Sequence, residues 1–190
     1  SFFSMELPAR YIEIDSGAGD GFPMYMTADE DTSQACYIIP DSHADHEKVD
    51  LVEGFGNDPD IDKEGMRKDF EEICGYVPDS RYEAYKCMIL LDIGKLDFPD
   101  YEKSNLINAL LETRNAFFAD HDKVYIYEKD GVNGVLTIKR EYSEALERIH
   151  TKGDFTFFTE DDPDTSYRIV ITDPDEEDIF KIINTVRFKQ

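Results

Sequence analysis

The sequence is short of basic residues. It has 20 lysines and arginines against 43 aspartates and glutamates, a formal net charge of −23 over 190 residues, and no basic residue stands between Arg10 and Lys48. A protein this acidic repels nucleic acid and anionic membranes, so direct binding to either is not expected. The same excess attracts a partner with a basic surface and speeds the encounter.

Cysteine is also scarce, and long apolar runs are absent. The three cysteines, Cys36, Cys74 and Cys87, stand far apart and form no C-x-x-C pair, which predicts reduced thiols in a cytoplasmic setting. No run approaches 18 apolar residues, so no membrane-spanning helix is expected. The opening SFFSMELPAR lacks the basic start and apolar core of a signal peptide.

Hydrophobic residues make up 41% of the chain and aromatic residues 13%, enough for a sizeable core. We expect one acidic α+β domain over residues 1–190, with a subdivision near 78–83 left open. Its fold class would be a mostly antiparallel sheet built from hairpins and packed against three or four helices.

Turn signals and β-rich runs predict strands at 10–14, 22–27, 35–39, 123–129, 135–142, 155–159 and 167–172. The continuous apolar run 84–93 predicts a central buried strand. Helices are expected at 62–77, 101–118 and 143–151, and a last one after residue 173. In this last helix Asp173 is the predicted N-cap, with Pro174 in the first turn and Glu176 completing a capping box.

The segment DSHADHEKVD, residues 41–50, holds two of the four histidines. Asp41, His43, Asp45 and His46 form a D-x-H-x-D-H pattern, which resembles the H-x-H-x-D-H metal-binding signature of the metallo-β-lactamase superfamily. The resemblance implies a metal-dependent hydrolase with His43, Asp45 and His46 as ligands. The chain departs from that signature in having Asp41 at the first histidine position. The other reading is a solvated polar loop.

Three aspartates before the expected helix at 62–77 form a second candidate metal site. Asp58, Asp60 and Asp62 match the first three ligand positions of a calcium-binding loop, but Lys63 and Asp69 replace its usual Gly and Glu. An acidic helix start, where carboxylates meet the positive end of the helix dipole, explains the same residues. We therefore expect neither a bound metal nor a cofactor.

The acidic residues are unevenly distributed. Segment 11–62 has fourteen acids and one base, and segment 160–178 has nine acids and one base. If the fold brings the two segments together, one face carries a strong negative field. Ten carboxylates form the predicted partner-binding set: Asp29, Glu30, Asp31, Asp58, Asp60, Asp62, Glu160, Asp161, Asp162 and Asp164.

Aromatic residues occur inside the same acidic segments. One or two of them, if exposed beside the carboxylates, would anchor a partner, because interface energy concentrates in such side chains. The candidates are Tyr11, Phe22, Tyr25, Tyr37, Phe55 and Tyr167.

These observations favour a non-enzymatic binding protein. It would dock its negative face on a basic, nucleic-acid-binding surface of a partner protein, such as a nuclease, and inhibit it. A phage anti-defence inhibitor, a nucleic-acid mimic and a toxin-immunity protein all act in this way. The alternatives are a metal-dependent hydrolase that uses the loop at 41–46, and an accessory domain with no site of its own. The oligomeric state stays open.

Overall fold

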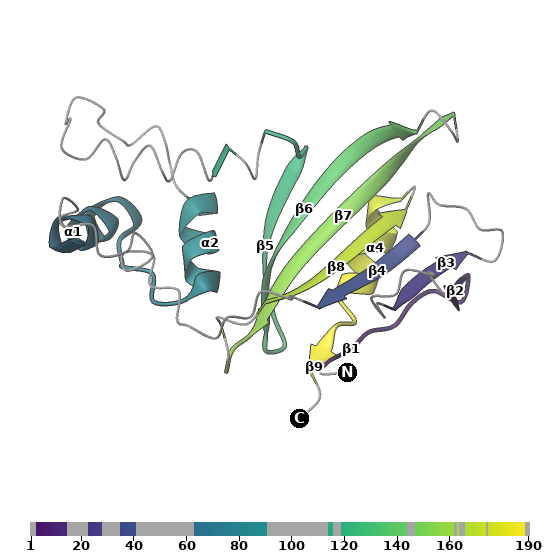
Figure 1. Ribbon diagram of the computed structural model, residues 1–190, viewed down its shortest axis with the longest axis horizontal. Coiled ribbons are helices and arrows are strands. Elements are labelled where there is room, and N and C mark those ends of the chain that lie inside the picture. Colours follow the sequence, from purple (N-terminus) through teal and green to yellow (C-terminus); the bar gives the residue numbers. More distant parts are fainter. Residues whose placement is uncertain are drawn as a thin grey trace.

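A seven-stranded antiparallel sheet forms the centre of the molecule, with strand order β2-β3-β4-β8-β7-β6-β5 (Figure 1). The computed structural model describes residues 3–14, 23–27, 35–40, 63–90, 114–115, 119–143, 147–161, 163, 166–173 and 175–188. The strands of this sheet are β2 (Tyr11–Ile14), β3 (Met24–Thr27), β4 (Ala35–Pro40), β5 (Lys123–Lys129), β6 (Val132–Ser143), β7 (Arg148–Thr159) and β8 (Tyr167–Asp173). A separate pair joins β1 (Phe3–Ser4) to β9 (Arg187–Phe188), so the two ends of the chain lie side by side.

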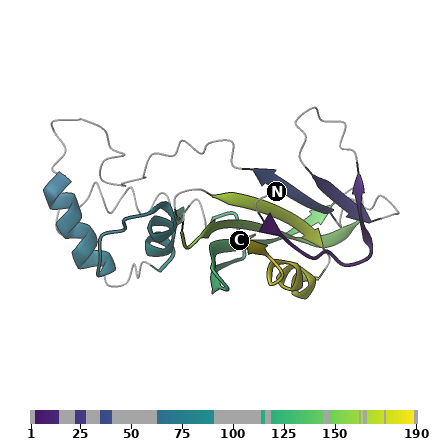
Figure 2. The same ribbon diagram turned by 90° about the horizontal axis from the view of Figure 1, so that it is seen from below.

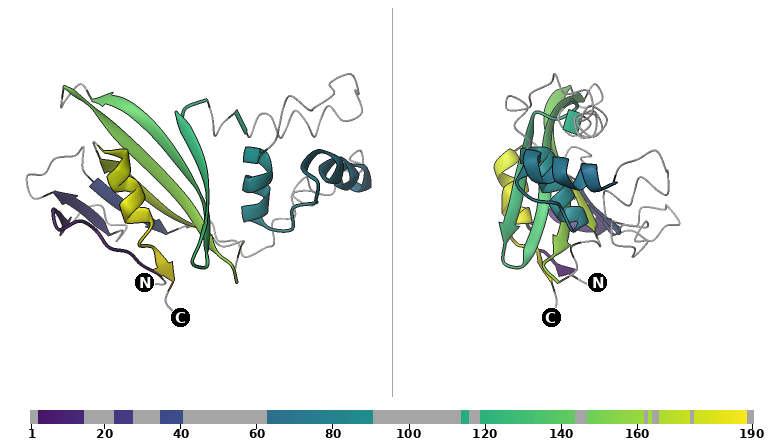
Figure 3. Two further views of the ribbon diagram at one scale, coloured as in Figure 1. Left: turned by 180° about the vertical axis from the view of Figure 1, so that it is seen from behind. Right: turned by 90° about the vertical axis from the view of Figure 1, so that its left-hand side faces the viewer.

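Three helices accompany the sheet: α1 (Lys63–Cys74), α2 (Arg81–Leu90) and α4 (Glu176–Ile183). Helix α4 lies across one face of the sheet (Figure 2), whereas α2 stands beyond the β5 edge and α1 lies further out (Figure 3). None of the helices in the described ranges is long and apolar enough to cross a membrane.

The predicted fold class is wrong. Of the described residues, 48% are in strands and only 26% in helices, and the three helices are short. No layer of helices covers the described sheet, since α4 alone lies across its face. The cause is that β6 and β7 are each twelve residues long and pair along their whole length, which takes up residues that we expected in a helix.

Two predicted elements have the wrong type. Residues 84–93 were expected as a buried strand, but Arg81–Leu90 is the helix α2, in which Ala84, Cys87 and Met88 are buried. That spacing defines one helix face, and a short apolar run alone cannot distinguish it from a strand. Residues 143–151 were expected as a helix, but Ser143 ends β6 and β7 begins at Arg148; residues 144–146 lie outside the described residues.

The other predicted elements agree better with the structure. The strands at 10–14, 22–27, 35–39, 123–129, 135–142 and 167–172 and the helix at 62–77 are confirmed within a few residues. The strand at 155–159 ends where predicted, but β7 already begins at Arg148. The last helix is also confirmed, but its N-cap is Asp175, whose side chain accepts a hydrogen bond from the Glu177 N–H. Of the predicted helix at 101–118, only residues 114 and 115 are described, and both are helical.

The hydrophobic core lies between α4 and the sheet. Ile179, Ile182 and Ile183 of the helix are fully or almost fully buried against apolar side chains of β6, β7 and β8. Gly153 of β7 allows this close approach, because a Cβ atom at that position would lie 2.6 Å from Cγ2 of Ile179. The strand therefore needs a residue without a side chain where the helix crosses.

The cysteines also differ from expectation. Cys74, the last residue of α1, forms a disulfide with Cys87 of α2, so two of the three thiols are not reduced. A separation of 13 residues in the sequence gave no sign of this pairing, which depends on how α1 turns back onto α2. Cys36 is a buried free thiol in β4, and burial raises its pKa to about 12.

Candidate acidic interface

The structure describes two of the ten predicted partner-binding carboxylates. Glu160 and Asp161 follow β7 and are exposed to solvent. The backbone N–H of Tyr82 donates to the carbonyl of Pro163 (3.2 Å), which holds this acidic turn beside the start of α2. The other eight lie outside the described residues: Asp29, Glu30, Asp31, Asp58, Asp60, Asp62, Asp162 and Asp164.

The two acidic segments of the sequence meet in the sheet. Strand β4 belongs to segment 11–62 and β8 to segment 160–178, and the two strands pair antiparallel from Ala35 opposite Thr172 to Pro40 opposite Tyr167. The chain therefore leaves β4 towards residues 41–62 at the end of the sheet where it enters β8 from residues 160–166. Strands β4 and β8 are far apart in the sequence, so the sequence alone did not indicate that they are neighbours.

The same pairing separates one predicted group from the others. Asp29, Glu30 and Asp31 connect Thr27 to Ala35, and Ala35 lies opposite Thr172 at the far end of β8. Strand β8 has seven residues, so the two ends of the sheet are about 20 Å apart at ~3.3 Å per residue. The points from which these acidic stretches start thus lie at opposite ends of the sheet.

Acidic residues at the α4 end of the sheet are largely paired with bases. Asp173 is 1% exposed and accepts hydrogen bonds from Nη2 of Arg10 (2.7 Å) and from the Tyr11 hydroxyl (2.7 Å). Asp178 contacts Lys181 (2.9 Å) and the same Arg10 atom (2.7 Å), and these two bases lower its pKa.

The neighbouring carboxylates of α4 have structural roles as well. Glu176 pairs with Lys123 (2.8 Å), and Glu177 pairs with Lys181 (3.2 Å). Carboxylates in the first turn also stabilise the positive end of the helix dipole. The acidic stretch 173–178 is therefore better explained by helix capping and ion pairing than by an open partner-binding surface.

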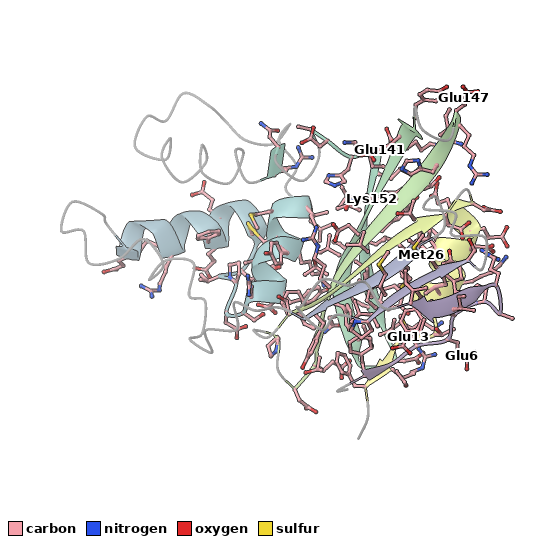
Figure 4. The ribbon with its side chains drawn as sticks, turned by 45° about the vertical axis from the view of Figure 1, so that its right-hand side comes forward. Glu6, Glu13, Met26, Glu141, Glu147 and Lys152 are labelled. Atoms are coloured by element: carbon pink, nitrogen blue, oxygen red, sulfur yellow. A yellow bond between two sulfur atoms is a disulfide. The ribbon has the colours of Figure 1, made fainter. Side chains whose placement is uncertain are left out.

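The sheet face opposite α4 is close to charge balance. Lys139 pairs with Glu141 (3.0 Å), and the Arg168 guanidinium donates to Asp154 (Nε–Oδ1 2.8 Å). Hydrogen bonding to Lys139 lowers the pKa of Glu141, and hydrogen bonding to Asp154 raises that of Arg168. Lys152 of β7, labelled beside Glu141 in Figure 4, also lowers the pKa of that carboxyl group.

The excess negative charge lies outside the described framework. The described stretches hold 22 of the 43 acidic residues but 16 of the 20 basic residues, so their formal net charge is −6. The remaining 21 acids and four bases give −17 to the other stretches of the chain. Most of the basic residues of the chain therefore lie in the described stretches.

The histidine motif also lies outside the described residues, which therefore leave its metal binding open. Strand β4 does end at Pro40, directly before Asp41, as the resemblance requires. Within the described ranges no group of three His, Cys, Asp or Glu side chains could hold a metal ion. The fourth histidine, His150, lies near Glu141 (3.6 Å between Nε2 and Oε2).

Tyr142 of β6, an aromatic residue that the structure describes as exposed, was not among the predicted anchors for a partner. Among the candidates, Tyr11 is buried, Tyr25 and Tyr167 are half-buried, and Phe22 and Phe55 are outside the described residues. Tyr37 lies in β4, and its side chain is also outside the described set. Tyr142 of β6, in contrast, is 62% exposed. Its place at the end of a predicted strand was the only signal available.

No protein family, curated protein or solved structure matches the chain. The protein can therefore be classified only by its architecture. It is a seven-stranded antiparallel sheet with helix α4 across one face, in a strongly acidic chain.

Proposed function

We propose that the protein is a non-enzymatic acidic binding protein that docks on a basic, nucleic-acid-binding surface of a partner protein and inhibits it. A phage anti-defence inhibitor or a toxin-immunity protein would act in this way. The observation that carries the proposal is the net charge of −23 together with the pairing of β4 and β8, which joins the two acidic segments of the sequence. An acidic excess of this size attracts a cationic partner.

The pairing of β4 with β8 supports the proposal further. It brings the start of the stretch 41–62 beside the turn that holds Glu160 and Asp161. Acidic stretches that start from one end of a sheet add their fields, which steers a basic partner to that end. The proposal includes a cytoplasmic location. The Cys74–Cys87 disulfide is the observation against that location, because disulfides persist mainly in oxidising compartments.

A metal-dependent hydrolase is the second candidate, and it rests on the D-x-H-x-D-H pattern directly after β4. Zinc, manganese or iron bound at one equivalent per chain, lost in a His43→Ala/His46→Ala variant, would favour it. Elemental analysis of the purified protein measures this directly.

The binding proposal is tested by capture from the native host followed by reconstitution. The immobilised protein should retain a nucleic-acid-binding protein at low salt, and the purified pair should lose at least about tenfold in affinity between ~50 and ~500 mM salt. Adding nucleic acid should displace the captured partner. Affinity that is unchanged over this range of ionic strength would rule the proposal out.

Charge-reversal variants locate the surface. Asp29→Lys/Glu30→Lys/Asp31→Lys and Asp58→Lys/Asp60→Lys/Asp62→Lys should each weaken binding to the reconstituted partner without unfolding the sheet. The matched control, Glu13→Lys/Glu71→Lys/Asp120→Lys, makes the same change in net charge at exposed, dispersed framework positions. If the control weakens binding equally, total charge rather than the predicted carboxylates determines affinity.

A further inference from the structure

The Cys74–Cys87 disulfide joins two helices that lie outside the sheet. Cys74 is the last residue of α1 and Cys87 lies within α2, 13 residues further along the chain. Figure 4 shows the sulfur–sulfur bond between the two helices. The third cysteine, Cys36, belongs to the core between α4 and the sheet and is not available for exchange. The pair therefore has two states, joined and open.

Helix α2 is attached to the sheet by contacts of its own. The hydroxyl of the buried Tyr82 donates to Glu128 of β5 (2.8 Å), and Lys86 forms an ion pair with the same carboxylate (2.5 Å). The Tyr82 and Tyr85 rings also meet the ring of Phe158 in β7, at centroid distances of 5.7 and 6.1 Å. None of these contacts involves a sulfur atom, so α2 stays on the sheet when the disulfide opens.

Each helix also has its own cap where the chain passes from α1 to α2. Gly75 follows α1 with a φ of 82°, and its N–H donates to the carbonyl of Glu71 (3.0 Å), which is a glycine C-cap. Ser80 precedes α2, and its hydroxyl accepts a hydrogen bond from the Glu83 N–H (3.2 Å), as an N-cap serine does. The disulfide is thus an additional link between two capped helices, and neither helix end requires it.

Helix α1 is the part whose position depends on the bond. It has 12 residues, a length at which an isolated helix is marginal in water. Phe70 and Cys74 stand four residues apart on one face, and Phe70 is 1% exposed, whereas Glu71 and Glu72 are exposed to solvent. A cross-link over a loop of this size favours the docked helix by on the order of a hundredfold. Opening the bond removes that factor and leaves non-covalent packing, such as that of Phe70, to hold α1.

The two sulfur atoms differ in their access to solvent. Cys87 is 3% exposed, whereas Cys74 is half-buried and is followed by the exposed Gly75. Disulfides are reduced when a thiolate attacks one sulfur and displaces the other. A thiolate from solvent therefore reaches Sγ of Cys74, and Sγ of Cys87 is the leaving group.

We propose that the Cys74–Cys87 disulfide is a redox switch, which a dithiol reductant of the thioredoxin class opens to release α1 from α2 while the sheet stays folded. One reductant thiolate bonds to Sγ of Cys74, the S–S bond breaks, and Sγ of Cys87 takes the electron pair and then a proton. The second reductant thiol, deprotonated, attacks the mixed disulfide and displaces Cys74, which is protonated in turn. The two cysteines gain two electrons and two protons, and the dithiol becomes a disulfide.

This switch goes beyond the proposed binding of a basic partner and does not require it. It assigns a different arrangement of α1 to each kind of compartment. In an oxidising compartment the bond is closed and α1 is docked, whereas in a reducing cytoplasm the bond is open and α1 is released.

Hydrogen exchange of the full chain, followed by mass spectrometry with and without excess dithiothreitol, tests the switch. Reduction should speed amide exchange in residues 63–74 by at least about tenfold, because the cross-link no longer favours the docked helix. Exchange in β6, β7 and β8 should not change. Cys74→Ser/Cys87→Ser should exchange fast in residues 63–74 under both conditions. The matched control, Cys36→Ala, removes a thiol outside the pair and should respond to the reductant as the unaltered chain does.

A thioredoxin-class protein that lacks its second cysteine identifies the attacked sulfur, because its mixed disulfide cannot be resolved. Peptide mapping should find it bound to Cys74, and capture on Cys87 would overturn that assignment. The switch itself is overturned if the protein purified without reductant has free thiols at both positions, or if reduction leaves exchange in residues 63–74 unchanged. Faster exchange throughout β6, β7 and β8 on reduction also overturns it, because the bond would then hold the whole domain together.

Discussion

Asp173 joins the N-terminal segment of the chain to the end of strand β8. It lies at the end of β8, is 1% exposed, and accepts hydrogen bonds from Arg10 and Tyr11 of the N-terminal segment and from the Asp175 N–H. A buried carboxylate is stable only when donors satisfy it. Burial raises the pKa of Tyr11, and its hydrogen bond to Asp173 raises it further. The hydroxyl therefore stays protonated and donates to Asp173.

Replacing Asp173→Asn should lower the free energy of unfolding by about 2 kcal/mol, because hydrogen bonds to a charged, buried acceptor are lost. Urea unfolding followed by circular dichroism measures the change. Asp178→Asn removes the other carboxylate on Arg10 from a more exposed position and should cost less than about 1 kcal/mol. Equal losses in both variants would mean that burial of Asp173 adds nothing.

Asp173 also shows how far single residues can be interpreted from the sequence. The segment TDPDEED predicted a capped helix start, and α4 does begin there. The sequence predicted Asp173 as the cap, but the cap is Asp175, because pairing with β7 holds Asp173 in strand β8. Likewise, nothing in the spacing of Cys74 and Cys87 revealed their disulfide.

Among the elements, α4 and β7 approach each other closely at Gly153. A Cβ atom on Gly153 would meet Ile179 Cγ2 at 2.6 Å, closer than van der Waals contact allows. Ile179 itself is fully buried, so it cannot move outward without opening the core. This contact sets the height of the helix above the sheet.

Gly153→Ala should therefore destabilise the protein by about 1–3 kcal/mol through overpacking. Ile179→Ala removes the clashing methyl, so in the double variant the loss should be smaller than the sum of the two single losses by more than ~1 kcal/mol. Gly153→Ala combined with Ile182→Ala is the control and should be nearly additive. Chemical denaturation of all five variants gives the cycle, and additivity with Ile179→Ala would contradict the contact.

The elements were predictable where periodicity was long and unambiguous. Alternation identified the strand segments of β5, β6 and β8, and the 3.6-residue repeat of Ile179, Ile182 and Ile183 identified α4. Prediction failed at α2, because a ten-residue apolar run fits a buried helix and a buried strand equally. It failed for the described part of 143–151 because pairing between β6 and β7, a tertiary effect, extends the strands to Ser143 and back to Arg148.

At the scale of the whole molecule, many of the described acidic residues form ion pairs in the fold. The described framework contains most of the bases and pairs many of its acids, as at Arg168–Asp154 and Lys123–Glu176. The composition showed the excess of −23 but not that internal ion pairs would neutralise the acidic stretch 173–178. Of the candidate site, the sequence therefore predicted the acidic segments and missed Tyr142.

Repulsion within a chain of net charge −23 should make its stability depend on the salt concentration. We expect the melting temperature to rise by several degrees between ~10 and ~300 mM sodium chloride, because screening reduces repulsion in the compact state. Thermal unfolding followed by circular dichroism measures it. The variant Asp29→Lys/Glu30→Lys/Asp31→Lys, which raises the formal charge by six, should show a smaller rise. A melting temperature that falls with salt would mean that ion pairs outweigh repulsion.

The pairing of β1 with β9 places Phe3 opposite Phe188. Their rings also meet, with centroids 6.5 Å apart, so the two ends of the chain are held together inside one aromatic cluster. A short flexible linker could join them, and new ends could then be opened at an exposed turn such as Asp130–Gly131. Because Arg187 of β9 pairs with Asp130 (3.0 Å), the new ends would lie beside the old ones, so a tag on the permuted chain would stay on the same side of the sheet.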